Sequence, residues 1–383
     1  MGTEIQRKLA AIQHIEEVKD IEGADAIQAY RVLGWWVVDK RGAHEVGDLV
    51  VYISIDSWVP HELAPFLSKG QEPRVYNGVK GERLRTIRLR GQISQGLLIK
   101  PEFHTLFEAR SIVGLAREDG TKPGRISGVG DGLDVTELFG IQKWEAPISA
   151  QLAGQASGTF PTSLIPKTDQ ERIQNCFGDI QKKAKRFATE KVWNAELQIL
   201  EEKPVEVPAD FQEPTYEVSM KLDGSSCTIF RWEGVLRVAS RNLELKINDE
   251  NKDNSFVAMA LKIGDKIPDG IALQGEIWGE SIQGNKEGIR GQRFSVFDVF
   301  DIRKHKYLLP VKRREICRTF GFDHVPVLGI DWKAPNSIEE ALSLASGPSI
   351  NAKNREGIVY KCNEDSSFSF KVISDEWLLK HGE

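Results

Sequence analysis

The sequence has no long hydrophobic run, no leader-like beginning and few cysteines. None of its apolar stretches approaches the roughly 20 residues that a membrane-spanning helix needs. Its first residues, Met-Gly-Thr-Glu-Ile-Gln-Arg-Lys, lack the apolar core of a secretory signal. The four cysteines are far apart and form no Cys-x-x-Cys pair, which argues against a zinc site or a disulfide scaffold. These absences predict a cytoplasmic protein with reduced thiols and no membrane partner.

The sequence also lacks an overall excess of positive charge, because its formal net charge is −5. That value argues mildly against nucleic-acid binding, but the distribution of charge matters more than its sum. Between residues 74 and 90 six basic side chains are opposed only by Glu82, and they are Arg74, Lys80, Arg83, Arg85, Arg88 and Arg90. Two smaller basic clusters lie at 182–186 and 303–314. Any of the three can be a solvated face, and the first is the favoured phosphate-binding track.

The length of 383 residues and the order of the patterns predict two domains. Residues 1–140 contain short β-type runs separated by turn signals, which is typical of a small barrel. Residues 141–165 include Ala-, Gly-, Ser- and Pro-rich sequence and are expected to be a linker. Residues 166–383 read as a second domain of strands and helices. In that domain we expect helices near 169–200, 254–263, 311–320 and 337–346, so the fold class is α+β.

The segment from Tyr216 to Gly224, Tyr-Glu-Val-Ser-Met-Lys-Leu-Asp-Gly, carries the clearest chemical signal. Its alternation predicts a strand with Lys221 at the end and an Asp-Gly turn after it. Lysine is a poor nucleophile at its free pKa of ~10.4, so a nucleophilic lysine must lie in a cleft that lowers it. On its own the tetrapeptide Lys-Leu-Asp-Gly at 221–224 is a weak signal, because most lysines at strand ends are simply solvated.

Five further segments follow the lysine in order. They are Ser240-Arg241-Asn242, Gln274-Gly275-Glu276-Ile277-Trp278-Gly279-Glu280, Arg293-Phe294-Ser295-Val296-Phe297-Asp298-Val299-Phe300, Arg355-Glu356-Gly357-Ile358-Val359-Tyr360-Lys361 and Ser369-Phe370-Lys371-Val372-Ile373-Ser374. Together with the Lys221 segment they resemble, in order, the six motifs of the covalent nucleotidyltransferase superfamily of ATP-dependent ligases and mRNA capping enzymes.

Within that superfamily the chain most resembles RNA ligases that carry an N-terminal OB domain and seal 3′-OH/5′-phosphate ends. The segment from Lys167 to Asn175 and the stretch from Arg7 to Tyr52 carry this closer resemblance. DNA ligases and capping enzymes have an OB domain after the last lysine motif, whereas only 12 residues follow Lys371 here. We therefore expect an OB-type β-barrel at 1–140 and a nucleotidyltransferase (adenylyltransferase) domain of antiparallel sheets and helices at 166–383.

The resemblance implies ATP as cofactor, with Mg²⁺ or Mn²⁺, and RNA ends in a nicked duplex as the partner, with no obligate protein partner. Lys221 would attack the α-phosphate of ATP and become lysyl-AMP. The adenylate would then pass to an RNA 5′-phosphate, and a 3′-OH would displace AMP to seal the ends. Such chemistry is typical of RNA repair.

Three carboxylates are implied as metal ligands, partly through water: Asp223, Glu276 and Glu356. Nearby carboxylates raise the pKa of a lysine, so they suit a nucleophilic Lys221 only if a divalent cation lies with them. Glu276 can contact the ribose instead. Taken singly, each of the three can be an ordinary surface carboxylate.

The remaining motif residues are implied as contacts to ATP or AMP. Arg241 would contact the ribose or a phosphate, Lys371 the α-phosphate, and Arg172 the β- and γ-phosphates. Many members carry two lysines at the last motif, whereas this chain has one, so Lys361 can share the role of the second. Arg172 and Arg241 can equally form salt bridges.

Phe297 would stack on adenine, with Val359 on its other side, although both can be core residues. Phe294 and Phe300 are expected in the core. Glu217 would reach the base edge or line the cleft.

Two other functions fit parts of the sequence. A DNA ligase is disfavoured by the absence of room after Lys371. A non-catalytic RNA-binding protein with a relic nucleotidyltransferase domain has no chemical reason to keep Lys221, Glu276, Glu356 and Lys371.

Overall fold

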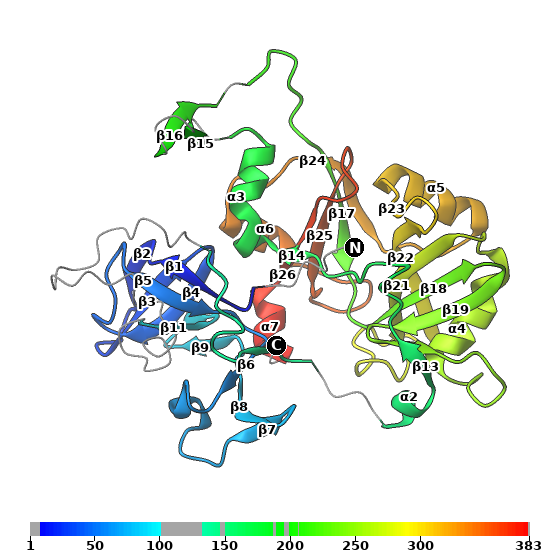
Figure 1. The fold of residues 1–383 in the computed structure, drawn as a ribbon, viewed down its shortest axis with the longest axis horizontal. Coiled ribbons are helices and arrows are strands. Elements are labelled where there is room, and N and C mark those ends of the chain that lie inside the picture. Colours follow the sequence, from blue (N-terminus) through cyan, green and yellow to red (C-terminus); the bar gives the residue numbers. More distant parts are fainter. Residues whose placement is uncertain are drawn as a thin grey trace. The chain divides into compact units, whose positions relative to one another are not determined.

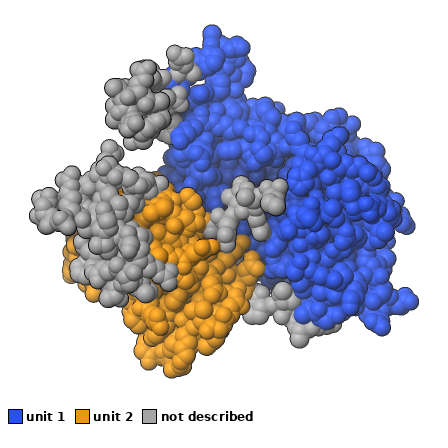
Figure 2. Space-filling view, viewed as in Figure 1, with its two compact units in different colours: residues 1–4, 148–377 blue, residues 5–147, 378–383 orange. Residues whose placement is uncertain are grey.

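The computed structural model describes residues 8–100, 132–145, 150–186, 189–194, 199–205 and 207–381. It divides into two compact units, one formed mainly by Ile5–Pro147 and the other mainly by Ile148–Trp377 (Figure 2). The division falls inside the segment 141–165 that the composition indicates as a linker. No helix among the described residues is long and apolar enough to cross a membrane.

The smaller unit is built from short strands, as expected for an OB-type domain (Figure 1). One sheet has the order β1-β5-β11, a second β2-β3-β4, a third β12-β6-β8-β7, and β9 pairs with β10. Their bounds are β1 (Ala10–His14), β2 (Glu17–Asp20), β3 (Ile27–Val32), β4 (Trp35–Lys40), β5 (Leu49–Ile53), β6 (Ser57–Pro60), β7 (Arg74–Tyr76), β8 (Val79–Arg83), β9 (Ile87–Leu89), β10 (Gln92–Ser94), β11 (Leu97–Ile99) and β12 (Gln142–Lys143), with the short helix η1 (Pro65–Ser68).

The core of the smaller unit follows from the alternation of these strands. Buried side chains of β1, β5 and β6, such as Ile12, Val51 and Val59, pack against Leu84 and Phe139. An apolar cluster of this kind lets a domain of mostly short strands hold together.

The larger unit contains two large sheets in which most neighbouring strands are antiparallel. The seven-stranded sheet has the order β13-β20-β19-β18-β21-β22-β23, and the five-stranded sheet β14-β26-β25-β17-β24. The strands of the first are β13 (Ala156–Thr159), β18 (Ser225–Trp232), β19 (Val235–Ser240), β20 (Leu243–Leu245), β21 (Ile271–Gly279), β22 (Gln292–Asp301) and β23 (Lys306–Tyr307). Those of the second are β14 (Glu171–Arg172), β17 (Tyr216–Lys221), β24 (Val327–Trp332), β25 (Gly357–Cys362) and β26 (Ser369–Ile373).

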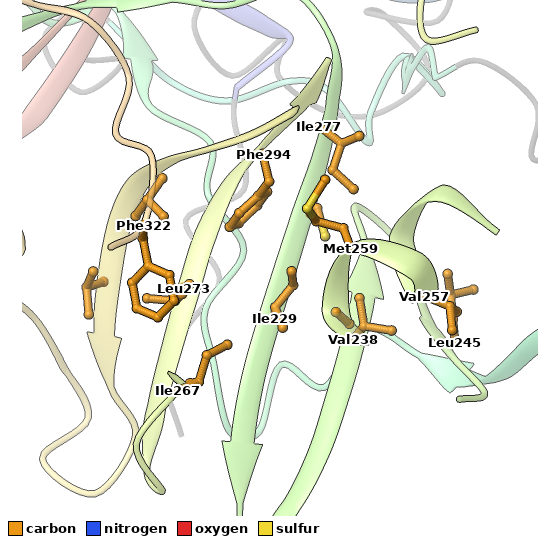
Figure 3. Close-up of a cluster of buried hydrophobic side chains, with 14 of the residues drawn as sticks. Ile229, Val238, Leu245, Val257, Met259, Ile267, Leu273, Ile277, Phe294 and Phe322 are labelled. Atoms are coloured by element: carbon orange, nitrogen blue, oxygen red, sulfur yellow. The ribbon is translucent and has the colours of Figure 1, made fainter. Parts of the chain in front are cut away.

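Helices cover these sheets and complete their cores. They are α2 (Ala150–Gly154), α3 (Ile173–Lys183), α4 (Ser255–Ile263), η4 (Gly264–Lys266), α5 (Pro310–Phe320) and α6 (Ile338–Ala345). A further helix, α7 (Asp375–His381), contains residues of both units. Figure 3 shows Val257 and Met259 of α4 against Ile229 and Val238 of the seven-stranded sheet. On the five-stranded sheet, side chains of α3 and α6, including Ile180 and Ala341, pack on Tyr216.

The α+β fold class is confirmed, and so are the helices expected near 254–263, 311–320 and 337–346. The single helix expected over 169–200 is wrong beyond Lys183. There the chain leaves the helix, Lys185 takes a left-handed φ of 55°, and a hairpin follows from β15 (Thr189–Asn194) and β16 (Ile199–Pro204). The alternating, β-branched and aromatic run Thr-Glu-Lys-Val-Trp-Asn favours that strand over helix.

Candidate active site

Lys221 ends β17 beside the first residue of β25. The two strands are antiparallel, and Lys221 lies opposite Gly357, so Glu356 comes directly before that pair. The predicted strand 216–221 is confirmed. Two glycines allow the backbones to approach closely here. A Cβ on Gly224 would lie 2.3 Å from the Ile277 carbonyl oxygen, and one on Gly357 would lie 2.2 Å from that of Val372.

The amine of Lys221 binds the carboxylate of Glu356. Lys221 Nζ lies 2.5 Å from Glu356 Oε1. Burial of the amine favours its neutral form, but the negative charges of Glu356, Glu276 and Asp223 together outweigh burial. The pKa of Lys221 therefore lies above its usual value, and the amine is protonated when no nucleotide or cation is bound.

Glu276 belongs to the same group of charges. It lies on β21 opposite Ser226 of the neighbouring strand β18. Burial raises the pKa of Glu276 to about 8, and the charges of Glu356 and Asp223 act in the same direction against the attraction of Lys221. At neutral pH Glu276 is therefore mainly protonated in the ligand-free site, beside the ion pair of Lys221 and Glu356.

Asp223 has a partner that the sequence did not reveal. Lys286, in the loop between β21 and β22, places Nζ 2.9 Å from Asp223 Oδ2. The same amine lies 4.5 Å from the ring centroid of Trp377. Across the described residues no three His, Cys, Asp or Glu side chains come close enough together to bind a metal directly. The predicted ligands Asp223, Glu276 and Glu356 are therefore brought together around the lysine, but not into a closed coordination shell.

A second group of cations gathers at Asp169. Its carboxylate lies 2.9 Å from Lys371 Nζ and 3.5 Å from Arg241. Arg172 stands next to Lys371 in the register of the parallel pair β14–β26, and its side chain is buried. Lys371 and Arg241, from separate motifs, thus share the carboxylate of Asp169, and Arg172 is the neighbour of Lys371 in the sheet. The sequence feature that could have identified Asp169 is its position in the Lys-Thr-Asp-Gln segment at 167–170.

Phe297 and Val359 come from opposite sheets. Phe297 on β22 and Val359 on β25 are both half-buried, whereas Phe294 and Phe300 are buried in hydrophobic clusters, as expected. Val359 lies opposite Ser219, two residues from Lys221 along β17 and on the same side of the strand. Phe297 packs against the cluster of Leu222, Trp278 and Val325, beside the end of the strand that carries Lys221, and Val359 lies on the same side of the five-stranded sheet as Lys221.

Next along the same strands lies a buried network of charges. Both carboxylate oxygens of Glu217 are bound, one by Arg313 and the other by Arg314 of α5. Asp298 binds Lys361 and lies 3.4 Å from Arg313. The network joins the five-stranded sheet, the seven-stranded sheet and α5, so it fixes the relative positions of the two sheets on either side of the site.

Lys361 reaches back toward the predicted adenine ligand. Its Nζ donates to the Phe297 carbonyl oxygen at 2.9 Å and lies 5.7 Å from the Phe297 ring centroid. Burial lowers the pKa of Lys361 to about 8, although Asp298 opposes the shift. Lys361 and Lys371 therefore lie in different parts of the site, the first at the network and the second at Asp169.

His324 completes the network in its neutral form. Arg313 Nε donates to His324 Nε2 at 3.0 Å, and His324 Nδ1 lies 2.6 Å from the Val325 carbonyl oxygen, which fixes the proton on Nδ1. Burial and the neighbouring Arg313 lower the pKa of His324 to about 4. Sequence reasoning missed His324 and the burial of Arg313, because a Lys-Arg-Arg run on a helix is typical of a solvated face.

Comparisons with known proteins place the chain in a family. A model of the RNA ligase family matches residues 214–373, which include the motif residues from Lys221 to Lys371, and a model of an OB-fold domain matches residues 9–101. The chain belongs to the RNA ligases, with an OB-fold domain N-terminal to the ligase domain.

Solved structures of Naegleria gruberi RNA ligase are similar to the chain over nearly its whole length. A form with AMP and Mn is 37% identical, with a TM-score of 0.75, and a form with ATP and Mn is 37% identical, with a TM-score of 0.74; each covers 98% of this chain and 99% of the other. A form with pyrophosphate is 36% identical with a TM-score of 0.75, and the coverage is the same. A search of curated proteins found no match.

Proposed function

We propose that the protein is an ATP-dependent RNA ligase that joins 3′-OH and 5′-phosphate RNA ends through lysyl-AMP and RNA-adenylate intermediates. The observation that carries the proposal is the pairing of Lys221 with Glu356, with Glu276 and Asp223 close enough to act on the same amine. The Naegleria ligase forms that hold ATP, AMP or pyrophosphate support a nucleotide-dependent reaction.

In the first step the lone pair of Lys221 Nζ attacks the α-phosphorus of ATP. A P–N bond forms, the bond to the β-phosphate oxygen breaks, and pyrophosphate leaves. The amine must first lose a proton, and Glu356 Oε1 is the acceptor at 2.5 Å. The charges of Glu356 and Asp223 hold the proton on Lys221 in the ligand-free site, so the site reacts only when this charge is compensated.

The carboxylate oxygens fit Mg²⁺ or Mn²⁺, which prefer oxygen ligands. Asp223, Glu276 and Glu356 would hold such an ion partly through its water molecules, because the described residues offer no direct three-ligand cluster. When bound, the cation supplies positive charge that offsets both the α-phosphate and the carboxylates around Lys221.

Each of the other motif residues would contact a different part of the nucleotide. Phe297 and Val359 would enclose adenine between the two sheets. Arg241 and Lys371 would exchange their contacts with Asp169 for contacts with ribose and phosphates, and Arg172, next to Lys371 in the sheet, would contact the β- and γ-phosphates. Glu217 and Lys361 would act at the base end, by holding the network that positions Phe297.

In the next two steps the RNA supplies the nucleophiles. An oxygen of the 5′-phosphate attacks the lysyl-AMP phosphorus and releases Lys221, and the 3′-OH then attacks the activated 5′-phosphate and releases AMP. We propose that a nicked duplex aligns these ends, as RNA repair requires. The four free cysteines, of which three are buried, fit the reducing cytoplasm as its compartment.

Two assays test the proposal. Incubation with ATP labelled at the α-phosphate and Mn²⁺ should give a covalently labelled protein, and Lys221→Ala should give none. Nicked duplexes ending in a ribose or a deoxyribose 3′-OH should then differ in sealing rate, with the ribose end faster. Equal rates would favour a DNA ligase, and the absence of any adduct would favour a non-catalytic RNA-binding protein.

A further inference from the structure

The structure divides the basic cluster at 74–90 into two sets. Three of its members bind carboxylates of the smaller unit. Arg74 lies 3.6 Å from Glu82, Lys80 lies 2.7 Å from Glu72, and Arg83 lies 2.7 Å from Asp56. Arg83 also lies 3.8 Å from the ring centroid of Trp144, so this side chain serves the fold of the unit.

The other three, Arg85, Arg88 and Arg90, are exposed. In the part of the chain that the structure describes, no acidic side chain forms an ion pair with any of them, and the stretch 83–95 contains no Asp or Glu. Exposed arginines beside carboxylates would be largely neutralised, whereas these three leave a local excess of positive charge.

Arg88 lies on β9 and Arg90 in the turn between β9 and β10, while Arg85 comes two residues before β9. Leu89 pairs with Gln92 and Arg88 with Ile93, so Arg90 and Gly91 form the two-residue turn. Both turn residues have a left-handed φ, 49° and 84°, as a tight hairpin turn requires. The turn therefore holds Arg90 at the tip in a defined backbone conformation.

The base of the hairpin is fixed, and its end is open. Ser94 Oγ accepts a hydrogen bond from the Val38 amide at 3.0 Å, and the Gln95 amide donates to the Trp36 carbonyl at 2.8 Å. Toward the tip, Ile87 is 47% exposed and Leu89 is 37% exposed. An anchored hairpin that presents both arginines and large apolar side chains to solvent has the composition of a binding element.

We propose that the β9–β10 hairpin is an RNA-backbone contact of the smaller unit. Arg85, Arg88 and Arg90 would bind phosphates, because the guanidinium fork matches two phosphate oxygens, and Ile87 and Leu89 would lie against the apolar faces of sugars or bases. Charge complementarity selects a polyanion as the occupant. The inference rests on the proposed function for its choice of RNA among polyanions.

The test compares two double variants of the full-length protein that remove the same charge. The hairpin variant carries Arg88→Gln and Arg90→Asn, since asparagine tolerates the left-handed backbone at position 90. The matched control carries Arg74→Gln and Lys80→Gln, which remove two cations that already have acidic partners in the same unit. Binding of a fluorescent nicked RNA duplex is measured at several salt concentrations.

The hairpin variant should bind RNA about 10-fold more weakly at moderate salt. The negative slope of the logarithm of the association constant against log[salt] should become shallower by roughly 1 to 2. The control should stay within about twofold of the parent protein. A third variant, Ile87→Ser with Leu89→Ser, should lose affinity at an unchanged salt slope, because it removes contacts that carry no charge.

Equal binding by the hairpin variant and the control would overturn the inference, and so would weaker binding at an unchanged slope in the arginine variant. Lysyl-AMP formation is measured in parallel and should be the same in all variants, which also shows that they fold. Absence of the adduct in the parent protein would refute the proposed function, while the RNA titration would still decide whether the hairpin binds RNA.

Discussion

Lys221 Nζ lies 2.5 Å from Glu356 Oε1, although the two residues are 135 positions apart in the sequence. In the proposed reaction, this pair keeps the amine of Lys221 protonated, and therefore unreactive, in the free protein. A carboxylate so near holds the proton on the amine, and only a change in the surrounding charge releases it.

Replacement of Glu356 by Gln should therefore make the free amine of Lys221 more reactive at a given pH. Removal of the negative charge lowers the pKa of Lys221, because Glu356 is the main group that raises it. Competitive labelling of lysines with an amine-reactive reagent is measured across pH, without nucleotide or metal. The pH at which labelling of Lys221 is half complete, its midpoint, reports the pKa of the amine. Glu364→Gln serves as the control, because Glu364 binds Thr215. An unchanged midpoint in Glu356→Gln would show that the pair does not control the amine.

Lys286→Met should reduce the Mn²⁺ concentration needed to occupy the site, by about threefold to tenfold. The amine of Lys286 lies 2.9 Å from Asp223 Oδ2 and competes with a divalent cation for that carboxylate. Electron paramagnetic resonance titration of Mn²⁺ with nucleotide-free protein gives the affinity directly. Lys312→Met removes a lysine that pairs with Glu315 and should change nothing. Weaker Mn²⁺ binding in Lys286→Met would mean that Lys286 serves to hold Asp223 in position.

Phe297→Leu should raise the KM for ATP in lysine adenylylation by about 10-fold, because stacking of a base on an aromatic ring is worth roughly 1–3 kcal/mol. Phe294→Leu is the matched control, since Phe294 is buried in the hydrophobic core. That variant should lose about 1 kcal/mol of folding free energy while the KM stays the same. The opposite pattern, in which Phe297→Leu loses stability and keeps its KM, would place Phe297 in the core.

The pH dependence of stability should carry the signature of His324. Its pKa is about 4 in the folded protein and near 6.5 when unfolded, so the unfolded state binds more protons between these values. The stabilisation is complete above the unfolded pKa and is lost as pH falls toward the folded one. Between about pH 7 and about pH 5 the loss should reach roughly 2 kcal/mol.

Urea unfolding of the parent protein and of His324→Gln measures this contribution. His324→Gln should not show the loss of unfolding free energy between about pH 7 and about pH 5 that His324 causes. His305→Gln, a change at an exposed histidine, should still show that loss. Parallel pH curves for the parent protein and His324→Gln would show that His324 is not held neutral in the folded state.

Local patterns predicted the elements that carry the chemistry. The strand ending at Lys221, the helices α4, α5 and α6 and the α+β class follow from periodicity and turn signals over a few residues. The order of the motifs added the family, because each short segment alone is ambiguous. What these signals share is that they lie within one stretch of chain.

The partners of the site residues could not be predicted in the same way. Lys286 reaches Asp223 from a loop in which Ser281, Gln283 and Asn285 adopt left-handed φ values, and no periodicity marks such a loop. Arg313 is buried only because Glu217 and Asp298 arrive from two different sheets. The hairpin after Lys183 depends on pairing of β15 with β16, which helix propensity does not report.

The most direct test of the account is peptide mapping by mass spectrometry after incubation with ATP and Mn²⁺. We predict the mass of one adenylate on the peptide that contains Lys221, its loss on addition of pyrophosphate or of nicked RNA, and its absence from Lys221→Ala. An adenylate on another residue, or none on freshly purified protein with any divalent metal, would contradict the central claim.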